Sequence, residues 1–235
     1  MAGKVFVSGA DKGLGFSLTN KFLKSGFQVF AGAYKPSSDF SSLIKEFPKM
    51  LTVVPIDVTD MDSVRRAAQQ VAKKVSSVDI LINNAAVYLE SKTMSLEEID
   101  LSDKYLAGTM DVNTFGPLRV TQQFLPLLEK GLSKMIINIS SEAGSIKDCR
   151  RNKEFAYCMS KTALNMQSKL LQNYLGPKGF KILTVHPGWM RTEMGGKEAD
   201  ISPDESAEGI FKLATKKWQT DDVIYIDYKG NPLNW

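Results

Sequence analysis

The chain of 235 residues is poor in the residue types that build metal and disulfide sites. It has two cysteines, Cys149 and Cys158, and one histidine, His186. A zinc site with four Cys or His ligands cannot be assembled from so few, so we expect neither a bound metal nor a disulfide framework. A serine or cysteine nucleophile would depend on His186 alone as its base, which disfavours a catalytic triad.

Long apolar runs and a strong excess of one charge are also lacking. No stretch approaches the roughly 18 apolar residues of a membrane span, and the segment that starts at Met1 lacks the apolar region of a signal peptide. Thirty Lys and Arg against 26 Asp and Glu leave a net charge of +4, without a block of like charge. We therefore expect a cytoplasmic protein that has neither nucleic acid nor a membrane as a partner.

What is present is typical of one globular domain. Hydrophobic residues make up 43% and charged residues 24% of the chain, and no internal repeat or Pro/Gly-rich linker divides it. We expect a single domain over residues 1–235. The polar segment Trp189–Ile201 contains two adjacent glycines and is predicted to be a lid.

Short apolar runs alternate with stretches of helical period along the whole chain. This alternation predicts an α/β fold of Rossmann type, in which a doubly wound parallel β-sheet has helices on both faces. The predicted strands are Lys4–Ser8, Gln28–Ala33, Leu51–Ile56, Val78–Ile82, Met135–Ile139 and Phe180–Val185. The predicted helices are Leu14–Lys24, Ser63–Val75, Asp111–Glu129, Phe155–Tyr174 and a last one from Ser202 to about Lys217.

A glycine-rich turn joins the first predicted strand to the first helix. Gly9, Gly13 and Gly15 follow the spacing G-x3-G-x-G, and Leu14 lies between the last two. Such a turn lets the backbone approach a pyrophosphate, whose charge is met by the N–H groups at the helix N-terminus. A simple strand-to-helix connection is the alternative, but the predicted strand before and helix after favour nucleotide binding.

The second strand ends in Tyr34 and Lys35, where a cofactor with free ribose hydroxyls would favour an acidic residue. Lys12 and Lys35 could instead flank a 2′-phosphate, which predicts a preference for NADP(H) over NAD(H). Two solvated surface lysines are the alternative interpretation.

A tyrosine beside a cation is a candidate proton donor. Tyr157 and Lys161 lie four positions apart at the start of a predicted helix, and therefore on one face. A nearby ammonium favours the phenolate and would lower the tyrosine pKa. Ser141 follows a buried strand, at the edge where ligands of such sheets bind.

Seven motifs in sequence order resemble the short-chain dehydrogenase/reductase family, and most of all its C-factor/sniffer-like carbonyl reductase branch. They are Ser8–Gly15, Asp57-Val58, Asn83–Ala86, Asn113–Gly116, Ile139–Ser141, Tyr157-x3-Lys161 and Pro187–Thr192. The resemblance covers essentially the whole chain.

The resemblance implies a role for each matching position. Tyr157 would be the proton donor, Lys161 would hold the nicotinamide ribose and lower the tyrosine pKa, Ser141 would bind the carbonyl oxygen, and Asn113 would order a water. Asp57 and Val58 would meet the adenine, Asn84 and Ala85 would line the cofactor cleft, and Pro187 and Thr192 would fix the carboxamide end. The expected cofactor residues are Gly9, Lys12, Gly13, Leu14, Gly15, Tyr34, Lys35, Asp57, Val58, Asn84, Ala85, Tyr157, Lys161, Pro187, Gly188 and Thr192.

The activity implied is the NADPH-dependent reduction of a ketone or aldehyde, or the reverse oxidation of an alcohol, by a homodimer or homotetramer. A cofactor-binding signalling protein with little turnover is the alternative. Two departures from the family pattern stand out. Ala86 stands where the family has a glycine, and an alanine would be strained there if the backbone needed a positive φ. A charged insert, Lys147–Lys153, separates Ser141 from Tyr157. We expect this insert at the surface, beside the substrate entrance.

Overall fold

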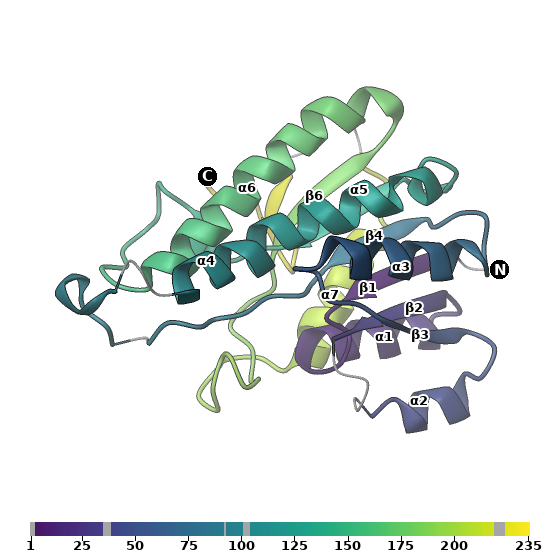
Figure 1. Ribbon diagram of the computed structural model, residues 1–235, viewed down its shortest axis with the longest axis horizontal. Coiled ribbons are helices and arrows are strands. Elements are labelled where there is room, and N and C mark those ends of the chain that lie inside the picture. Colours follow the sequence, from purple (N-terminus) through teal and green to yellow (C-terminus); the bar gives the residue numbers. More distant parts are fainter. Residues whose placement is uncertain (1–2, 35–38, 92, 101–103, 219–223) are drawn as a thin grey trace.

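The computed structural model describes residues 3–34, 39–91, 93–100, 104–218 and 224–235 (Figure 1). Within these residues, seven parallel strands form one sheet in the order β3-β2-β1-β4-β5-β6-β7. The strands are β1 (Lys4–Ser8), β2 (Gln28–Ala33), β3 (Leu51–Pro55), β4 (Ile80–Asn83), β5 (Met135–Ile139), β6 (Lys181–His186) and β7 (Tyr225–Asp227). This is the predicted doubly wound sheet.

Helices cover both faces of the sheet. Residues of α1, α2 and α7 share one apolar core with it, and residues of α3, α5 and α6 share another, on the opposite face (Figure 1). The helices are α1 (Gly13–Lys24), α2 (Ser41–Glu46), α3 (Met61–Ala72), α4 (Lys104–Met110), α5 (Gly116–Leu128), α6 (Phe155–Leu175) and α7 (Pro203–Thr215). Shorter helical turns are η1 (Leu96–Glu98), η2 (Asp111–Phe115), η3 (Glu142–Gly144) and η4 (Gly176–Lys178).

The strands divide their side chains between the two cores. In β1, Val5 and Val7 belong to the core under α1, whereas Phe6 belongs to the core under α5. Successive side chains of a strand point to opposite faces, and a sheet covered on both faces buries both sets. This burial on both faces is the reason that each strand is a continuous apolar run in the sequence.

Two helical segments differ from the predictions. The short helix α2 was not predicted, because only Leu43 of its six residues is buried and no helical period extends beyond it. The helix expected from Asp111 begins earlier, at Lys104, and passes through the π-helical turn η2 before α5. Apolar spacing cannot reveal this turn, which hydrogen bonds between residues five apart define.

The strand order indicates that a functional site lies at the carboxyl ends of the central strands. The sequence of connections reverses between β1 and β4, which are neighbours in the sheet although β2 and β3 separate them along the chain. Ligands of open α/β sheets bind at the carboxyl ends of the strands beside such a switch point. No helix in the described part of the chain is long and apolar enough to cross a membrane.

Candidate active site

The glycine-rich turn between β1 and α1 lies at the switch point and is tightly packed. Gly9 and Gly13 have φ of +63° and +53°, in the region that favours glycine. A Cβ on Gly9 would lie 2.7 Å from the Cα of Ala85, and one on Gly15 would lie 2.0 Å from the carbonyl oxygen of Gly9. Glycine at these positions therefore lets the turn, the end of β4 and α1 approach one another closely.

Asn84, directly after β4, fastens the turn. Its Nδ2 donates hydrogen bonds to the carbonyl oxygens of Ser8 (3.1 Å) and Gly9 (2.9 Å). In return, the Ser8 hydroxyl accepts from the backbone N–H groups of Asn84 (3.1 Å) and Ala85 (3.2 Å). The neighbouring Ala86 is unstrained, because only Lys134 and Glu154 among the described non-glycine residues have a positive φ.

The N-terminus of α1 fits the phosphate groups of a dinucleotide. No described side chain caps this end, and its first turn contains no acidic residue, so no carboxylate there would repel an anion. Leu14 is buried beneath it. Lys12 precedes the helix, and its ammonium forms an ion pair with the carboxylate of Glu193.

The residues expected around the adenosine end are only partly described. The side chain of Tyr34 is 63% exposed at the end of β2, and Lys35 lies outside the described residues. After β3, the carboxylate of Asp57 accepts hydrogen bonds from the backbone N–H (2.9 Å) and the hydroxyl (2.6 Å) of Thr59, while Val58 is buried. These bonds orient Asp57 at the edge of the sheet that carries the glycine-rich turn.

The segment Trp189–Ile201 crosses the glycine-rich turn. A Cβ on Gly13 would lie 3.4 Å from Cγ2 of Thr192, in ordinary van der Waals contact. The indole N–H of Trp189 donates to the carbonyl oxygen of Gly195 (2.8 Å), a bond within the segment. Before it, the Pro187 carbonyl oxygen accepts from the Ser206 hydroxyl (2.6 Å) and Gly188 has a φ of +83°.

Lys161 is buried on α6 and points back toward β5. Its ammonium donates a hydrogen bond to the carbonyl oxygen of Ile139 (2.9 Å), at the carboxyl end of that strand. Burial lowers the Lys161 pKa from 10.5 to about 8, because the protein replaces the water that would solvate its charge. The same Nζ lies 5.7 Å from the centre of the Tyr157 ring.

The pKa of Tyr157 differs from the expectation based on sequence. Burial raises it to about 12, and the nearby Ser141 hydroxyl opposes this increase. The sequence predicts that the Lys161 ammonium lowers the pKa, but in the structure the loss of hydration outweighs the attraction of the Arg151 guanidinium. Tyr157 is therefore a phenol, the form that can donate a proton, throughout the neutral range.

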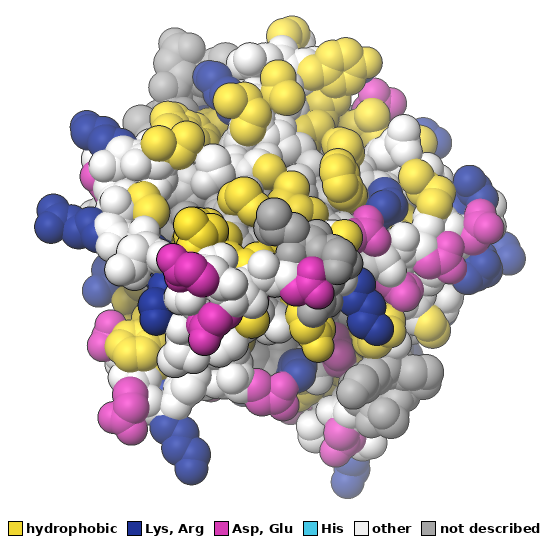
Figure 2. Space-filling view, turned by 60° about the vertical axis from the view of Figure 1, so that its left-hand side comes forward, with side chains coloured by type: hydrophobic (Ala, Val, Ile, Leu, Met, Phe, Trp, Pro, Cys, Tyr) yellow, Lys and Arg dark blue, Asp and Glu magenta, His cyan; other side chains and the backbone are white. Residues whose placement is uncertain are grey.

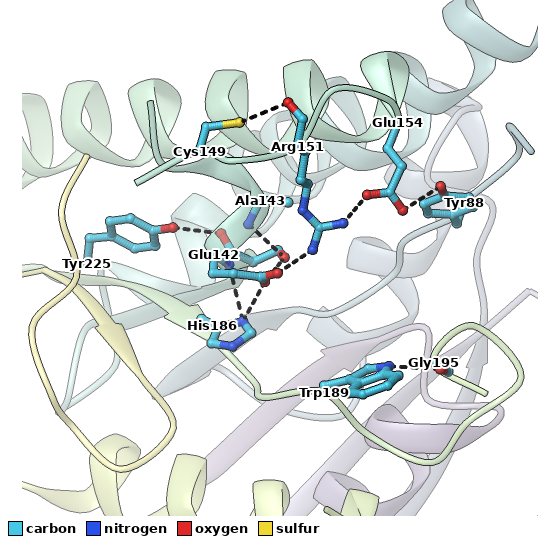
Figure 3. A network of polar contacts seen from close by, with 11 residues as sticks. Tyr88, Glu142, Ala143, Cys149, Arg151, Glu154, His186, Trp189, Gly195 and Tyr225 are labelled. Atoms are coloured by element: carbon cyan, nitrogen blue, oxygen red, sulfur yellow. Dashed lines mark hydrogen bonds and ion pairs between the residues drawn. The ribbon is translucent and has the colours of Figure 1, made fainter. Parts of the chain in front are cut away.

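Ser141 links Tyr157 to a carboxylate that the sequence reasoning did not single out. The Ser141 hydroxyl donates to Oε2 of Glu142 (2.6 Å) and accepts from the backbone N–H of Ala143 (3.1 Å). Nδ1 of His186 accepts from the backbone N–H of Glu142 (3.2 Å), and burial lowers the His186 pKa, so the imidazole is neutral at neutral pH (Figure 3). The contact of His186 with the Glu142 carboxylate is therefore not an ion pair, because the ring is neutral.

Arg151, from the charged insert, bridges two carboxylates above this serine. Its guanidinium binds Glu142 on one side and Glu154 on the other, and the Tyr88 hydroxyl donates to Glu154 (2.8 Å) (Figure 3). Arg151 and Ser141 both hold the pKa of Glu142 below its usual value, although burial acts in the opposite direction. The insert is thus at the surface, as expected, and one of its side chains reaches the site.

Figure 2 shows the end of the molecule to which this insert belongs. Hydrophobic side chains gather across the upper half of this face, and acidic and basic side chains lie below and beside them.

Glu90 accepts hydrogen bonds from the backbone N–H groups of Ala156 (3.2 Å) and Tyr157 (2.6 Å) at the start of α6. Glu90 therefore caps the helix that carries the tyrosine.

Asn113 lies in the π-helical turn η2, and its side chain makes three hydrogen bonds. Its amide accepts from the backbone N–H of Val87 (2.8 Å) and donates to the carbonyl oxygen of Val87 (2.9 Å) and the hydroxyl of Ser160 (3.1 Å). The side chain thus joins the connection after β4 to α6. The Oδ1 atom accepts one of these bonds and has a second acceptor position, which a water can use.

The structure therefore brings Ser141, Tyr157 and Lys161 together. Asn113 of η2 is joined to this group by its hydrogen bond to Ser160, which lies on α6 between Tyr157 and Lys161. Sequence reasoning missed Glu142, Glu90 and Arg151. Glu142 directly follows Ser141, and Arg151 lies in the noted insert, so position along the chain was an available signal for both. Glu90 reaches Tyr157 from 67 positions away, which no local pattern could show.

Residues 4–202 match the short chain dehydrogenase family. The chain belongs to this family. It is 35% identical over 158 residues to C-signal of Myxococcus xanthus, covering 67% of this chain and 93% of that protein.

Two solved structures of this family share the fold over almost their full length. Carbonyl reductase Sniffer of D. melanogaster superposes with a TM-score of 0.91 at 26% identity, covering 100% of both chains. NADPH-bound carbonyl reductase from chicken fatty liver superposes with a TM-score of 0.87 at 30% identity, covering 99% of this chain and 98% of that one. This short-chain dehydrogenase is thus an NAD(P)-dependent oxidoreductase that resembles carbonyl reductases.

Proposed function

We propose that this short-chain dehydrogenase reduces a ketone or aldehyde with NADPH, and that it can oxidise the corresponding alcohol in reverse. The observation that carries the proposal is the cluster at the carboxyl end of β5. There burial keeps Tyr157 a phenol beside Ser141, and Lys161 donates a hydrogen bond to the carbonyl oxygen of Ile139. NADPH supplies a hydride to the carbonyl carbon, and the chain's own residues must bind the carbonyl oxygen and give it a proton.

Each catalytic side chain has a defined role in this proposal. Tyr157 donates its phenolic proton to the substrate oxygen, which becomes the hydroxyl of the alcohol. Ser141 gives a hydrogen bond to the same oxygen and holds it near the phenol. Lys161 binds the nicotinamide ribose, and its positive charge stabilises the phenolate that remains. Asn113 keeps η2, α6 and the connection after β4 together, and its side-chain or backbone carbonyl oxygen is the candidate site for a relay water.

The remaining proposed residues bind the cofactor. The glycine-rich turn and the open N-terminus of α1 take the pyrophosphate, and Asp57 and Val58 lie at the strand edge proposed for the adenine. Lys12, with Lys35 and Tyr34, is proposed to meet the 2′-phosphate. Pro187, Gly188 and Thr192 are proposed at the carboxamide end, since Thr192 contacts the turn at Gly13.

The test is the oxidation of NADPH in the presence of a panel of ketones and aldehydes, followed by absorbance. The wild type should consume NADPH, and Tyr157→Phe should lose about a thousandfold in kcat while its NADPH affinity stays within about twofold. Tyr105→Phe, at an exposed tyrosine of α4, is the control and should keep full activity. Turnover by Tyr157→Phe at the wild-type rate would remove the tyrosine from its role.

A signalling protein with little turnover is the second candidate, because the relative from Myxococcus xanthus is named C-signal. The two candidates differ in one measurement. Tight binding of NADPH without oxidation of it by any carbonyl in the panel favours the signalling function. Turnover that depends on Tyr157 favours the enzyme.

The segment Trp189–Ile201 is proposed to act as a lid over the bound cofactor. Its contact with Gly13 and the ion pair between Glu193 and Lys12 already lie on the proposed pyrophosphate site. Amide hydrogen exchange of this segment should slow when NADPH is added. Unchanged exchange at saturating NADPH would contradict the lid.

Pairing of two chains is proposed to use α5 and α6, which together expose several large apolar side chains. These are Leu118 on α5 and Met166, Leu170 and Tyr174 on α6. Such a surface favours a homodimer, or a homotetramer built from two dimers. Light scattering should give a mass of two or four times 26.0 kDa, and a mass of one chain would contradict pairing.

A further inference from the structure

The turn that carries Ser141 is held on one side by α6. It runs from Ser141 through η3, and Gly144 touches the helix so closely that a Cβ there would lie 2.9 Å from the carbonyl oxygen of Lys161. The Gly144 carbonyl oxygen accepts hydrogen bonds from Thr162 (3.2 Å) and Asn165 (3.1 Å) of α6. The helix of Tyr157 and Lys161 therefore sets one boundary of the turn.

Tyr225, on the edge strand β7, holds the other side. Its side chain is fully buried, and its hydroxyl donates a 2.6 Å hydrogen bond to the carbonyl oxygen of Ser141 (Figure 3). The backbone N–H of Gly144 donates to the same oxygen (3.0 Å), so both of its acceptor positions are used. Burial raises the Tyr225 pKa to about 12, so the phenol remains a donor at any ordinary assay pH.

Residues 233–235, which we call the tail, fix Tyr225 and the far end of the turn. The Trp235 ring stacks on the Tyr225 ring, with centres 5.0 Å apart at an angle of 25°. The carbonyl oxygen of Trp235 accepts from the backbone N–H of Lys147 (3.0 Å), and the amide of Asn234 donates to the carboxylate of Asp148 (3.0 Å). Leu233 donates its N–H to the Tyr225 carbonyl oxygen (2.9 Å), which folds the tail back along β7.

We propose that Tyr225, supported by Trp235, is a positioning residue that places the Ser141 hydroxyl for the reaction. The inference deepens the proposed carbonyl reduction and rests on it. A hydrogen bond to the Ser141 carbonyl fixes the peptide plane from which the serine side chain projects, and hence the distance from its hydroxyl to Tyr157. Small displacements of a catalytic group of about 1 Å can reduce a rate about a hundredfold.

A purely structural role for Tyr225 makes a different prediction, and Tyr228 provides the matched control. Tyr228 is a second buried tyrosine of the same segment, and its hydroxyl donates to Glu205 of α7 (3.1 Å) instead of to the Ser141 turn. Tyr225→Phe and Tyr228→Phe each remove one hydroxyl and one hydrogen bond and leave the ring in place. If the tyrosines act only through stability, equal losses of stability should have equal effects on turnover.

The experiment compares the two variants with wild type, using NADPH and a carbonyl compound that the wild type reduces. Tyr225→Phe should lower kcat about tenfold or more, with KM and the Kd for NADPH within about twofold. Tyr228→Phe, at a similar Tm, should keep kcat within about twofold. A kcat for Tyr225→Phe within that range, or an equal loss in Tyr228→Phe, overturns the proposal.

Two further measurements keep the test decisive. Trp235→Leu, at a half-exposed side chain that is easier to replace, should lower kcat in the same direction by about threefold, again without a change in KM. Hydrogen exchange of the Ala143 amide, which donates to the Ser141 hydroxyl, should accelerate in Tyr225→Phe and not in Tyr228→Phe.

The exchange measurement needs no turnover and therefore separates the two proposals. Absence of any carbonyl reduction by the wild type contradicts the proposed function. Equal exchange of the Ala143 amide in Tyr225→Phe and wild type contradicts the positioning role, whatever the wild type does with carbonyls.

Discussion

The hydroxyl of Ser141 donates its hydrogen to the carboxylate of Glu142, 2.6 Å away, and not to an open position beside Tyr157. A serine hydroxyl has one hydrogen to donate. The proposed hydrogen bond from Ser141 to a substrate oxygen therefore replaces the bond to Glu142. Because Arg151 shares that carboxylate, the guanidinium weakens Glu142 as an acceptor and favours the exchange.

The first prediction concerns how the charges of Glu142 and Arg151 set the pH dependence of turnover. Burial is the main cause of the raised Tyr157 pKa, and the Glu142 carboxylate raises it further whereas Arg151 lowers it. Reduction requires the protonated phenol, so kcat/KM should fall as the pH rises through the Tyr157 pKa. Glu142→Gln should move this fall to lower pH, and Arg151→Gln should move it to higher pH.

The profile of kcat/KM against pH measures both shifts. Arg150→Gln, at the exposed neighbouring position, is the control and should leave the profile in place. Shifts of the same sign in Glu142→Gln and Arg151→Gln would show that these charges do not act through Tyr157.

The second prediction separates stability from activity at Lys161. Its side chain is 2% exposed, and the decrease of its pKa from 10.5 to about 8 corresponds to a cost of about 3 kcal/mol for keeping the charge buried at neutral pH. Lys161→Met removes this cost but leaves the Ile139 carbonyl oxygen without its donor. We expect a net gain of about 1–2 kcal/mol in the free energy of unfolding at pH 7, with activity lost.

The sign of this effect depends on pH. The wild type bears the full cost below about pH 8, where Lys161 is charged in the folded and unfolded states, and none above about pH 10.5, where it is neutral in both. The advantage of Lys161→Met in denaturant unfolding should therefore shrink between these values. A variant less stable than the wild type at pH 7 would contradict the buried charge.

The third prediction concerns the discrimination between NADPH and NADH. Lys12 lies in the glycine-rich turn and is paired with Glu193. If Lys12 binds the 2′-phosphate, Lys12→Ala should weaken NADPH binding about tenfold and leave the Kd for NADH nearly unchanged. Glu193→Gln should tighten NADPH, because the ammonium then has no competing carboxylate at that position.

Fluorescence titration with the two cofactors gives these constants. Lys24→Ala, at the opposite end of α1, should change neither Kd. Equal affinities of the wild type for NADPH and NADH would discard the assignment of Lys12 to the phosphate.

The fourth prediction tests the packing of the glycine-rich turn. A methyl group at Gly15 would lie 2.0 Å from the Gly9 carbonyl oxygen, so Gly15→Ala must push α1 away from the turn. We expect a loss of about 1–3 kcal/mol in stability, with NADPH binding weakened beyond detection. Gly108→Ala in α4, where the nearest atom would be 3.4 Å away, should be neutral or more stable by up to about 1 kcal/mol. Normal NADPH binding by Gly15→Ala would show that the close approach is dispensable.

Most of the fold was predictable because its signals are local. The strands β1 and β2 were predicted at their observed bounds, since both faces of the sheet are buried and each strand is a continuous apolar run. The π-helical turn η2 was not predictable, because it depends on Asn113 binding Val87 and Ser160, which belong to other segments. The spacing of Tyr157 and Lys161 correctly placed both on α6, but the direction of the Tyr157 pKa shift required knowledge of its burial.

The order of apolar runs, the three glycines of the turn and the four-residue spacing on α6 are properties of neighbouring residues, so the chain itself determined the doubly wound sheet and the candidate catalytic pair. Contacts between distant residues were decided only by the tertiary structure. Tyr225 binds the Ser141 carbonyl from 84 positions away, and Lys12 meets Glu193 across 181 positions. Such contacts depend on which strands become neighbours and on how closely the connections pack, and neither quantity leaves a periodic pattern in the sequence.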